Sequence, residues 1–209
     1  MTPGPTIIRK CSVCGKLIAQ RTIASGNTCG ARFWTDGKRE APMLPERLWL
    51  VKCQHCGAVV WIDEQDEVGE VVPWGAADAK FDGALPYEHP SFADYLAVLG
   101  SGLSDSRKQR YLRLSAWWAG NDTRRRVNGA SALNADEAAN LRAFMALLDD
   151  SDENDRLTKA EALRELGEYP KSLELLSGPF REGLARSASI VRDLVTQRTP
   201  LVKEMDLGS

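Results

Sequence analysis

The period of the hydrophobic positions changes near residue 90. Before it, short apolar runs over residues 6–10, 17–23, 48–52 and 58–62 stand between polar and turn-forming stretches, as in short β-strands. After it, apolar residues recur every three or four positions, which is the spacing of one helix face. The pattern predicts an α+β protein with a small β domain in front of an all-α domain.

Turn and capping residues divide the two halves further. In the front half, Asp36-Gly37 is a candidate hairpin turn, and the acidic residues 63–70 are expected to end the β domain. In the back half, Gly167 is placed to end a helix. Six helices are expected: one after Ser91, one from Ser104 or Asp105 to a stop at Asn121-Asp122, one after Asn134, one over about 153–166, one after Pro170 and one over about 180–197.

Residues 73–90 contain three prolines and two glycines without a hydrophobic period. They are expected to form a linker draped over one or both domains. The sequence therefore predicts a β domain with an inserted loop over residues 1–72, a linker over 73–90 and a helical domain over 91–209.

Four cysteines form the strongest chemical signal in the chain. They make two C-x-x-C pairs, Cys11 with Cys14 and Cys53 with Cys56, and each pair is preceded by lysine and followed by glycine. Such pairs curl the backbone so that both sulfurs face one ion, and the following glycine permits the tight turn. Two pairs together predict one closed tetrahedral site for a structural Zn²⁺ ion in a zinc ribbon. The 38 residues between the pairs correspond to the inserted loop.

Other interpretations of the cysteines stay open. Rubredoxin-type iron uses the same four ligands, so ligand type alone does not exclude it. Two disulfides are a further alternative, although the chain begins without the apolar core of a signal peptide and five cysteines in 209 residues do not form a disulfide-dense scaffold. His55 is interpreted as a residue on the surface of its knuckle, and Cys29 as a buried small apolar residue rather than a ligand or nucleophile.

Residues 162–176 resemble the middle of a tetratricopeptide repeat (TPR). Gly167, Tyr169 and Ser172 occupy the places of the Gly after the first helix, the aromatic of the turn and the small residue of the second helix. No 34-residue period runs through the chain, so a TPR-like domain is expected rather than an array of repeats.

The whole chain resembles a largely uncharacterised bacterial family with an N-terminal zinc ribbon and a C-terminal TPR-like helical domain. Beyond the cysteine pairs, the resemblance rests on these stretches: 25–28, 34–38, 41–45, Trp61, Trp117-Trp118, Asn121-Asp122 and 164–167. It implies a metal-binding, protein-interacting, cytoplasmic protein and supplies no catalytic motif. Cys29 stands where a bulkier apolar residue is expected.

Charge and hydropathy narrow the classes of partner. The net charge is -2, with nine basic and nine acidic residues before residue 79 and 18 basic and 20 acidic residues after it. Neither half is a basic module, which disfavours non-specific nucleic-acid binding. No apolar run approaches the ~20 residues of a membrane span. Thiols kept for metal indicate a reducing cytoplasm.

Two stretches are candidate partner surfaces. The first is the polar and aromatic loop with Asn27, Arg32, Trp34, Asp36, Lys38 and Arg39, whose alternative role is packing between ribbon and helices. The second is the run Arg124, Arg125 and Arg126 after two tryptophans, which could grip nucleic acid or an acidic protein and whose alternative is a solvated loop beside a buried tryptophan pair.

No catalytic constellation is present in the sequence. The two histidines, His55 and His89, lack a neighbouring triad partner, and no phosphate loop or metalloprotease motif occurs. A closed four-thiolate site also leaves no open coordination position for catalysis. The leading expectation is a non-enzymatic zinc-containing adaptor for a protein partner. The alternatives are a nucleic-acid-binding zinc ribbon, an enzyme or electron carrier, and, within the adaptor class, an inhibitor that neutralises a bacterial toxin.

Overall fold

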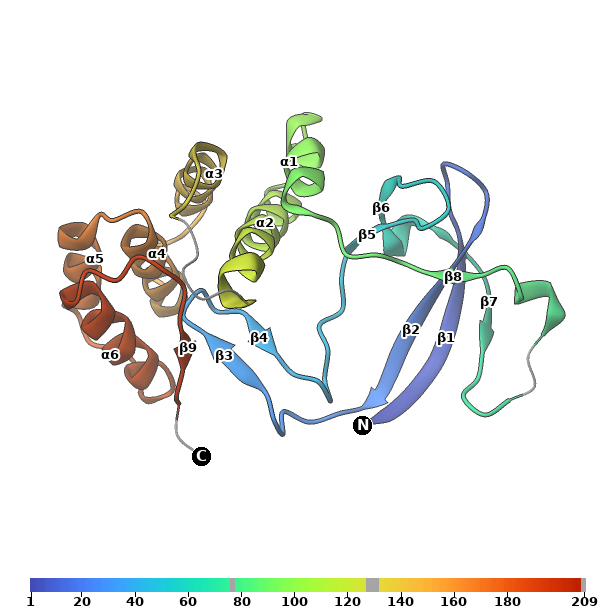
Figure 1. Cartoon of the computed structure of the whole chain (residues 1–209), viewed down its shortest axis with the longest axis horizontal. Coiled ribbons are helices and arrows are strands. Elements are labelled where there is room, and N and C mark those ends of the chain that lie inside the picture. Colours follow the sequence, from blue (N-terminus) through green and yellow to red (C-terminus); the bar gives the residue numbers. More distant parts are fainter. Residues whose placement is uncertain (76–77, 127–131, 208–209) are drawn as a thin grey trace. The chain divides into compact units, whose positions relative to one another are not determined.

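The computed structural model describes residues 1–75, 78–126 and 132–207. Strands occupy the N-terminal part and six helices follow them in the described chain, so the α+β class and its order are confirmed (Figure 1). The chain divides into two compact units. Unit 1 contains residues 1–31 and 40–90, and unit 2 contains residues 32–39 and 91–209. Each unit is therefore built from two separate stretches of chain.

A four-stranded sheet forms the frame of unit 1. β1 (Thr2–Lys10) pairs antiparallel with β2 (Leu17–Ser25) and with β7 (Asp66–Val71), and β8 (Leu85–Pro86) adds a short parallel pair to β2. The strand order is β7-β1-β2-β8. Alternate residues of one face, including Ile8, lie under the segment that carries η2 (Ala79–Phe81) and β8. Ile8 is consequently buried.

Residues 63–70 were expected to end the ribbon, and in the structure the chain continues through them as regular elements. They form η1 (Ile62–Glu64) and most of β7, an edge strand of the main sheet. Acidic side chains suit an edge strand, where one side of the backbone faces solvent. Residues 73–90, the expected linker, contain η2 and β8 and belong to unit 1; residues 76–77 lie outside the described part of the chain.

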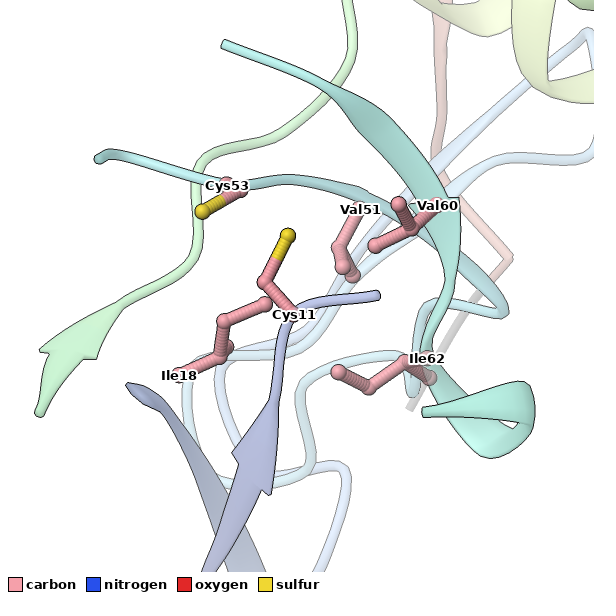
Figure 2. Close-up of a cluster of buried hydrophobic side chains, with 6 residues drawn as sticks. All are labelled: Cys11, Ile18, Val51, Cys53, Val60 and Ile62. Carbon is pink, nitrogen blue, oxygen red and sulfur yellow. The ribbon is translucent and has the colours of Figure 1, made fainter. Parts of the chain in front are cut away.

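A second, two-stranded sheet in unit 1 carries the other cysteine pair. β5 (Leu50–Lys52) and β6 (Val59–Trp61) pair antiparallel around Cys53–Cys56, as the apolar runs predict. The core of unit 1 joins the two hairpins: Cys11, Ile18, Val51, Cys53, Val60 and Ile62 form one buried cluster (Figure 2). Two of the four candidate ligands are thus core residues of the unit.

Unit 2 contains the six helices. They are α1 (Phe92–Gly100), α2 (Ser106–Arg126), α3 (Ala135–Met145), α4 (Glu153–Glu165), α5 (Tyr169–Leu176) and α6 (Glu182–Thr196). Ser91 and Asn134 form capping boxes, and Gly167 takes the left-handed conformation after α4, so these three boundaries are confirmed. α4, α5 and α6 share one buried cluster around Ala160, Leu176 and Val191. Residues 127–131 and 208–209 of the expected helical domain lie outside the described residues.

Helix α2 does not stop at Asn121-Asp122 as predicted but continues to Arg126. The side chain of Asn121 is fully buried, and its Nδ2 donates hydrogen bonds to Asp36 and Glu165. Asp122 accepts an ion pair from Arg125 one turn later. Because both polar side chains have tertiary partners, neither competes for the helix backbone as it would in an isolated peptide.

The segment Arg32–Arg39 supplies unit 2 with a short hairpin. β3 (Arg32–Trp34) and β4 (Arg39–Glu40) are joined by a turn at Asp36-Gly37, and β3 also pairs with β9 (Glu204–Met205) near the end of the chain. The Gly37 N–H donates to the carbonyl of Trp34, and Gly37 has φ of 79°, which favours glycine. The predicted hairpin turn is confirmed.

A buried polar network ties this hairpin to the helices of unit 2. The Asp36 carboxylate accepts a hydrogen bond from Asn121 and forms an ion pair with Arg125 of α2. The backbone carbonyl of Asp36 accepts a hydrogen bond from the Trp118 indole N–H. Thr35 Oγ1 accepts from Arg164 of α4. The bonded groups fix the geometry of a packed interior, although Arg125 Nε and Trp34 Nε1 are buried without a hydrogen-bond partner among the described residues.

Among the described residues, no helix combines the length and the apolar character that crossing a bilayer requires.

Candidate metal centre

Two turns of near-identical geometry hold the four cysteines. In the first, the Gly15 N–H donates to the Cys11 carbonyl at 2.8 Å, and the Cys11 N–H donates to the Lys16 carbonyl at 2.9 Å. In the second, the Gly57 N–H and the Cys53 N–H donate to Cys53 and Ala58 carbonyls at the same two distances. The sequence repeat of lysine, two cysteines and glycine thus folds into the same turn twice.

The glycine that ends each turn is required by its backbone. Gly15 has φ of 70° and Gly57 has φ of 73°, in the left-handed region that side chains with a Cβ rarely adopt. A Cβ at either position would meet only the far end of the preceding lysine chain, at 3.7 Å and 3.9 Å, so space is not the constraint. Backbone conformation alone explains both glycines.

The four sulfurs converge on one point. The Sγ atoms of Cys11, Cys14, Cys53 and Cys56 all lie within 4.8 Å of one another, and the Cys14 and Cys53 sulfurs are 3.9 Å apart. A tetrahedron with metal–sulfur bonds of about 2.3 Å has edges of about 3.8 Å, so the set fits one tetrahedral ion. Figure 2 shows the sulfurs of Cys11 and Cys53 directed toward the space between the two hairpins. The predicted convergence of the two cysteine pairs is confirmed.

Burial differs among the four thiols. Cys11 and Cys53 are fully buried, Cys14 is half-buried and Cys56 is exposed. Burial raises the pKa of the Cys53 thiol to about 12. Burial also acts to raise the pKa of Cys11, but hydrogen bonds from the Cys14 and Val13 backbone outweigh it and bring that pKa down to about 7. A bound cation would supply the charge that keeps such buried sulfurs deprotonated.

Gln65 supports the first turn from the side, and sequence reasoning missed it. Its Oε1 accepts from the Ser12 N–H at 2.8 Å, and its Nε2 donates to the Trp61 carbonyl at 3.0 Å. The Gln65 carbonyl accepts from buried Arg9, which also donates to Gln20. This network joins both hairpins beside the cysteines. A lone glutamine in an acidic stretch gave no signal of this role in the sequence.

The remaining histidine and cysteine take no part among the sulfurs. His55 is exposed, and its Nε2 lies 3.1 Å from the Leu17 carbonyl, as expected of a residue on the knuckle surface. Cys29 is exposed rather than the buried small residue that was expected. It lies in a polar turn, where its N–H donates to the Asn27 side chain, and such a turn offers no apolar pocket.

The first candidate partner surface separates into exposed and buried residues. Asn27 and Arg39 are exposed, whereas Trp34 and Asp36 are buried inside unit 2. Arg32 pairs with Glu204 and stacks on the Trp34 ring, and Lys38 pairs with Asp122. Asn27 belongs to unit 1 and the other five residues to unit 2.

The second candidate surface, the arginine run, is the last turn of α2. Arg124 pairs with Glu137 and Arg125 pairs with Asp36, and both side chains are less than a tenth exposed. Arg126 is exposed. Two of the three guanidinium groups therefore serve ion pairs inside unit 2.

Comparison with known proteins adds no relative: no protein-family model, curated protein or solved structure matches the chain.

Proposed function

We propose that the protein is a non-enzymatic adaptor in which one structural zinc ion stabilises a ribbon-like β unit and a TPR-like helical unit contributes to binding a protein partner. The observation that carries the proposal is the convergence of four cysteine sulfurs in a closed set. Four thiolates fill a tetrahedral zinc shell and leave no position for substrate or water, which is the arrangement of structural sites.

The helical unit supports the TPR-like part of the proposal at one contact. Ser172, the small residue of the resemblance, is fully buried on α5, and its Oγ donates to the Ala160 carbonyl of α4 at 2.7 Å. A larger side chain there would force α4 and α5 apart. Stacked helix pairs of this kind present extended surfaces for other proteins.

The arginine run gives little support to nucleic-acid binding, because Arg124 and Arg125 are paired with carboxylates inside unit 2. Nucleic-acid binding depends on exposed protein cations that neutralise phosphates and so release the counterions condensed on the nucleic acid. Inhibition of a toxin remains one form that the adaptor function could take, since it also requires only a protein-binding surface.

The test combines metal analysis with affinity capture. Protein purified without added metal should contain one zinc per chain and lack the visible absorption of an iron–thiolate centre. Tagged full-length protein should retain a specific partner from lysate of its native cells, and Cys53→Ser should lose it. A stoichiometric iron signal would contradict the zinc assignment, and capture of nothing beyond the tag control would contradict the adaptor.

A further inference from the structure

Trp74 is the most exposed large apolar side chain in the described residues, at 95%. It lies in the turn Val72-Pro73-Trp74-Gly75, directly after edge strand β7, and the Gly75 N–H donates to the Val72 carbonyl at 3.2 Å. Its φ is 64°. Proline at the second position and positive φ at the third are the pattern of a type II turn, which favours glycine or asparagine where this chain has tryptophan.

Neither packing nor backbone preference accounts for this tryptophan. A bulky residue with positive φ is a true outlier and carries backbone strain. Packing within the described chain does not offset this strain, because the Trp74 side chain is almost entirely exposed to solvent. Tryptophan is, however, enriched with tyrosine and arginine among the residues that contribute most to the affinity of protein interfaces.

The strand that leads to Trp74 has a free edge. β7 pairs only with β1 among the described strands, and Figure 1 shows no strand beyond it. Val68 lies at a bulge, where β7 has one residue more than β1, and it is 42% exposed. Val72 is 53% exposed at the end of the same strand. The edge and its turn thus combine open backbone groups with an apolar surface.

The negative charge of the segment around β7 favours a basic partner. Residues 63–82 carry seven carboxylates and one lysine, a net charge of -6. Asp63, Glu67 and Asp78 have basic partners, but Asp66 and Glu70 on β7 form no ion pair within the described chain. Because they lie opposite Lys10 and Ile7 of β1, Asp66 and Glu70 point to opposite faces of the sheet. A second copy of this acidic edge would be repelled, whereas a basic strand would be attracted.

We infer that the outer edge of β7 and the Trp74 turn bind an extended, lysine- or arginine-rich segment of another protein. The segment adds a strand to β7, its basic side chains on one face lie beside Glu70, and one cation stacks on the Trp74 ring. This inference deepens the proposed adaptor function and rests on it for its biological meaning, because it names the surface and the chemistry of the partner.

The test uses the full-length, zinc-loaded protein and a labelled synthetic peptide. The probe is a peptide of about ten residues that alternates lysine and threonine, long enough to span a strand, with a glutamate–threonine peptide as its counterpart. Fluorescence anisotropy measures binding, and amide chemical shifts locate it. The lysine peptide should bind, should shift amides within residues 66–75, and should bind more weakly as salt rises.

Two variants test the surface, and each has a matched control. Trp74→Gly removes the side chain while keeping a residue that suits the turn, and it should weaken binding at least about tenfold. Glu70→Lys should also weaken binding of the lysine peptide, because it replaces an attractive charge with a repulsive one. The controls are Leu173→Ala, another exposed apolar residue, and Glu174→Lys, an exposed charge reversal on α5. Both should stay within about twofold of wild type.

The inference is overturned if the two peptides bind alike, if the lysine peptide does not bind, or if Trp74→Gly binds as wild type does. Affinity capture separates this result from the adaptor proposal. A cellular partner retained equally by wild type and Trp74→Gly would support the adaptor and refute the surface. Peptide binding that depends on Trp74, without any captured cellular partner, would support the surface and count against the adaptor.

Discussion

Glu165 occupies an unusual position among the buried charges of unit 2. The cluster contains three buried carboxylates, Asp36, Glu161 and Glu165, and two buried guanidinium groups. Arg125 pairs with Asp36 and Arg164 pairs with Glu161. The direct hydrogen bonds to Glu165 come from the neutral donors Trp117 and Asn121. Burial, with the nearby charges of Glu161 and Asp36, raises the pKa of Glu165 to about 8.

This position predicts a loss of stability as pH rises. Between the ordinary glutamate value of 4.5 and about 8, folded Glu165 holds a proton that the unfolded chain has released, so the free energy of unfolding falls across that window. The full effect is on the order of 5 kcal/mol. Glu165→Gln should flatten the fall and exceed wild type in stability near pH 9. Urea unfolding of both proteins at several pH values measures the difference; parallel pH profiles would contradict it.

The cysteines differ in the consequences of their loss. Cys53→Ser removes a candidate ligand that is fully buried in the core of unit 1, so both metal binding and the packing of that unit should be lost. Cys29→Ser, at an exposed thiol outside the set, should keep one metal ion per chain and the wild-type melting temperature. Metal content and thermal melts compare the two variants, and equal metal content in both would refute the assignment of Cys53.

At the scale of elements, local patterns predicted regular structure well where tertiary contacts agree with them. Ser91 and Asn134 start helices through capping boxes, and the two cysteine turns lie between paired strands. The pattern failed at Asn121, whose helix-ending preference is overridden by its buried bonds to Asp36 and Glu165. The pattern also failed at β7. This edge strand is rich in acidic residues and lacks the alternation of apolar and polar residues by which a strand is predicted.

The contact between Gln65 and the first cysteine turn belongs to the same scale, since it joins η1 and β7 to the hairpin of β1 and β2. Gln65→Ala removes the side-chain acceptor of the Ser12 N–H and the side-chain donor to the Trp61 carbonyl, at a cost of about 1–3 kcal/mol. We expect faster transfer of zinc to a competing chelator and a lower melting temperature. Gln54→Ala, at an exposed position inside the second turn, is the control and should leave both unchanged. Equal transfer rates for Gln65→Ala and wild type would show that the contact does not stabilise the site.

At the scale of the whole molecule, the two units have separate interiors. The buried cluster of unit 1 includes Cys11 and Cys53, whereas the clusters of unit 2 are formed by helix residues such as Trp117, Phe144 and Val191. The sequence predicted the order of strands and helices and the shared cysteine site. It did not predict that residues 32–39 belong with the helices, because the reason lies in buried partners of Asp36 and Thr35 more than 80 residues away.

Removal of the metal should therefore unfold the region around the cysteine turns of unit 1 and leave the helices of unit 2 folded. A strong zinc chelator under reducing conditions should abolish amide protection around the cysteine turns, because the buried sulfurs lose the ion that holds the two hairpins together. Helical circular dichroism at 222 nm should persist, since the cores of unit 2 contain no ligand. Hydrogen exchange resolved by peptide measures both regions at once. Simultaneous loss of protection in α4–α6 would contradict the prediction.

Residues 32–39 belong to unit 2 although they lie between two stretches of unit 1 in the sequence, and this has a consequence for recombination. Genetic recombination moves contiguous segments of a gene, but a cut at residue 90 would leave Arg125 and Arg164 without Asp36 and Thr35. A transplanted helical segment would keep the ion pairs of Arg125 with Asp122 and of Arg164 with Glu161, but it would lose the buried acceptors that Asp36 and Thr35 supply. A helical segment that is moved without residues 32–39 would therefore need compensating substitutions at these buried contacts.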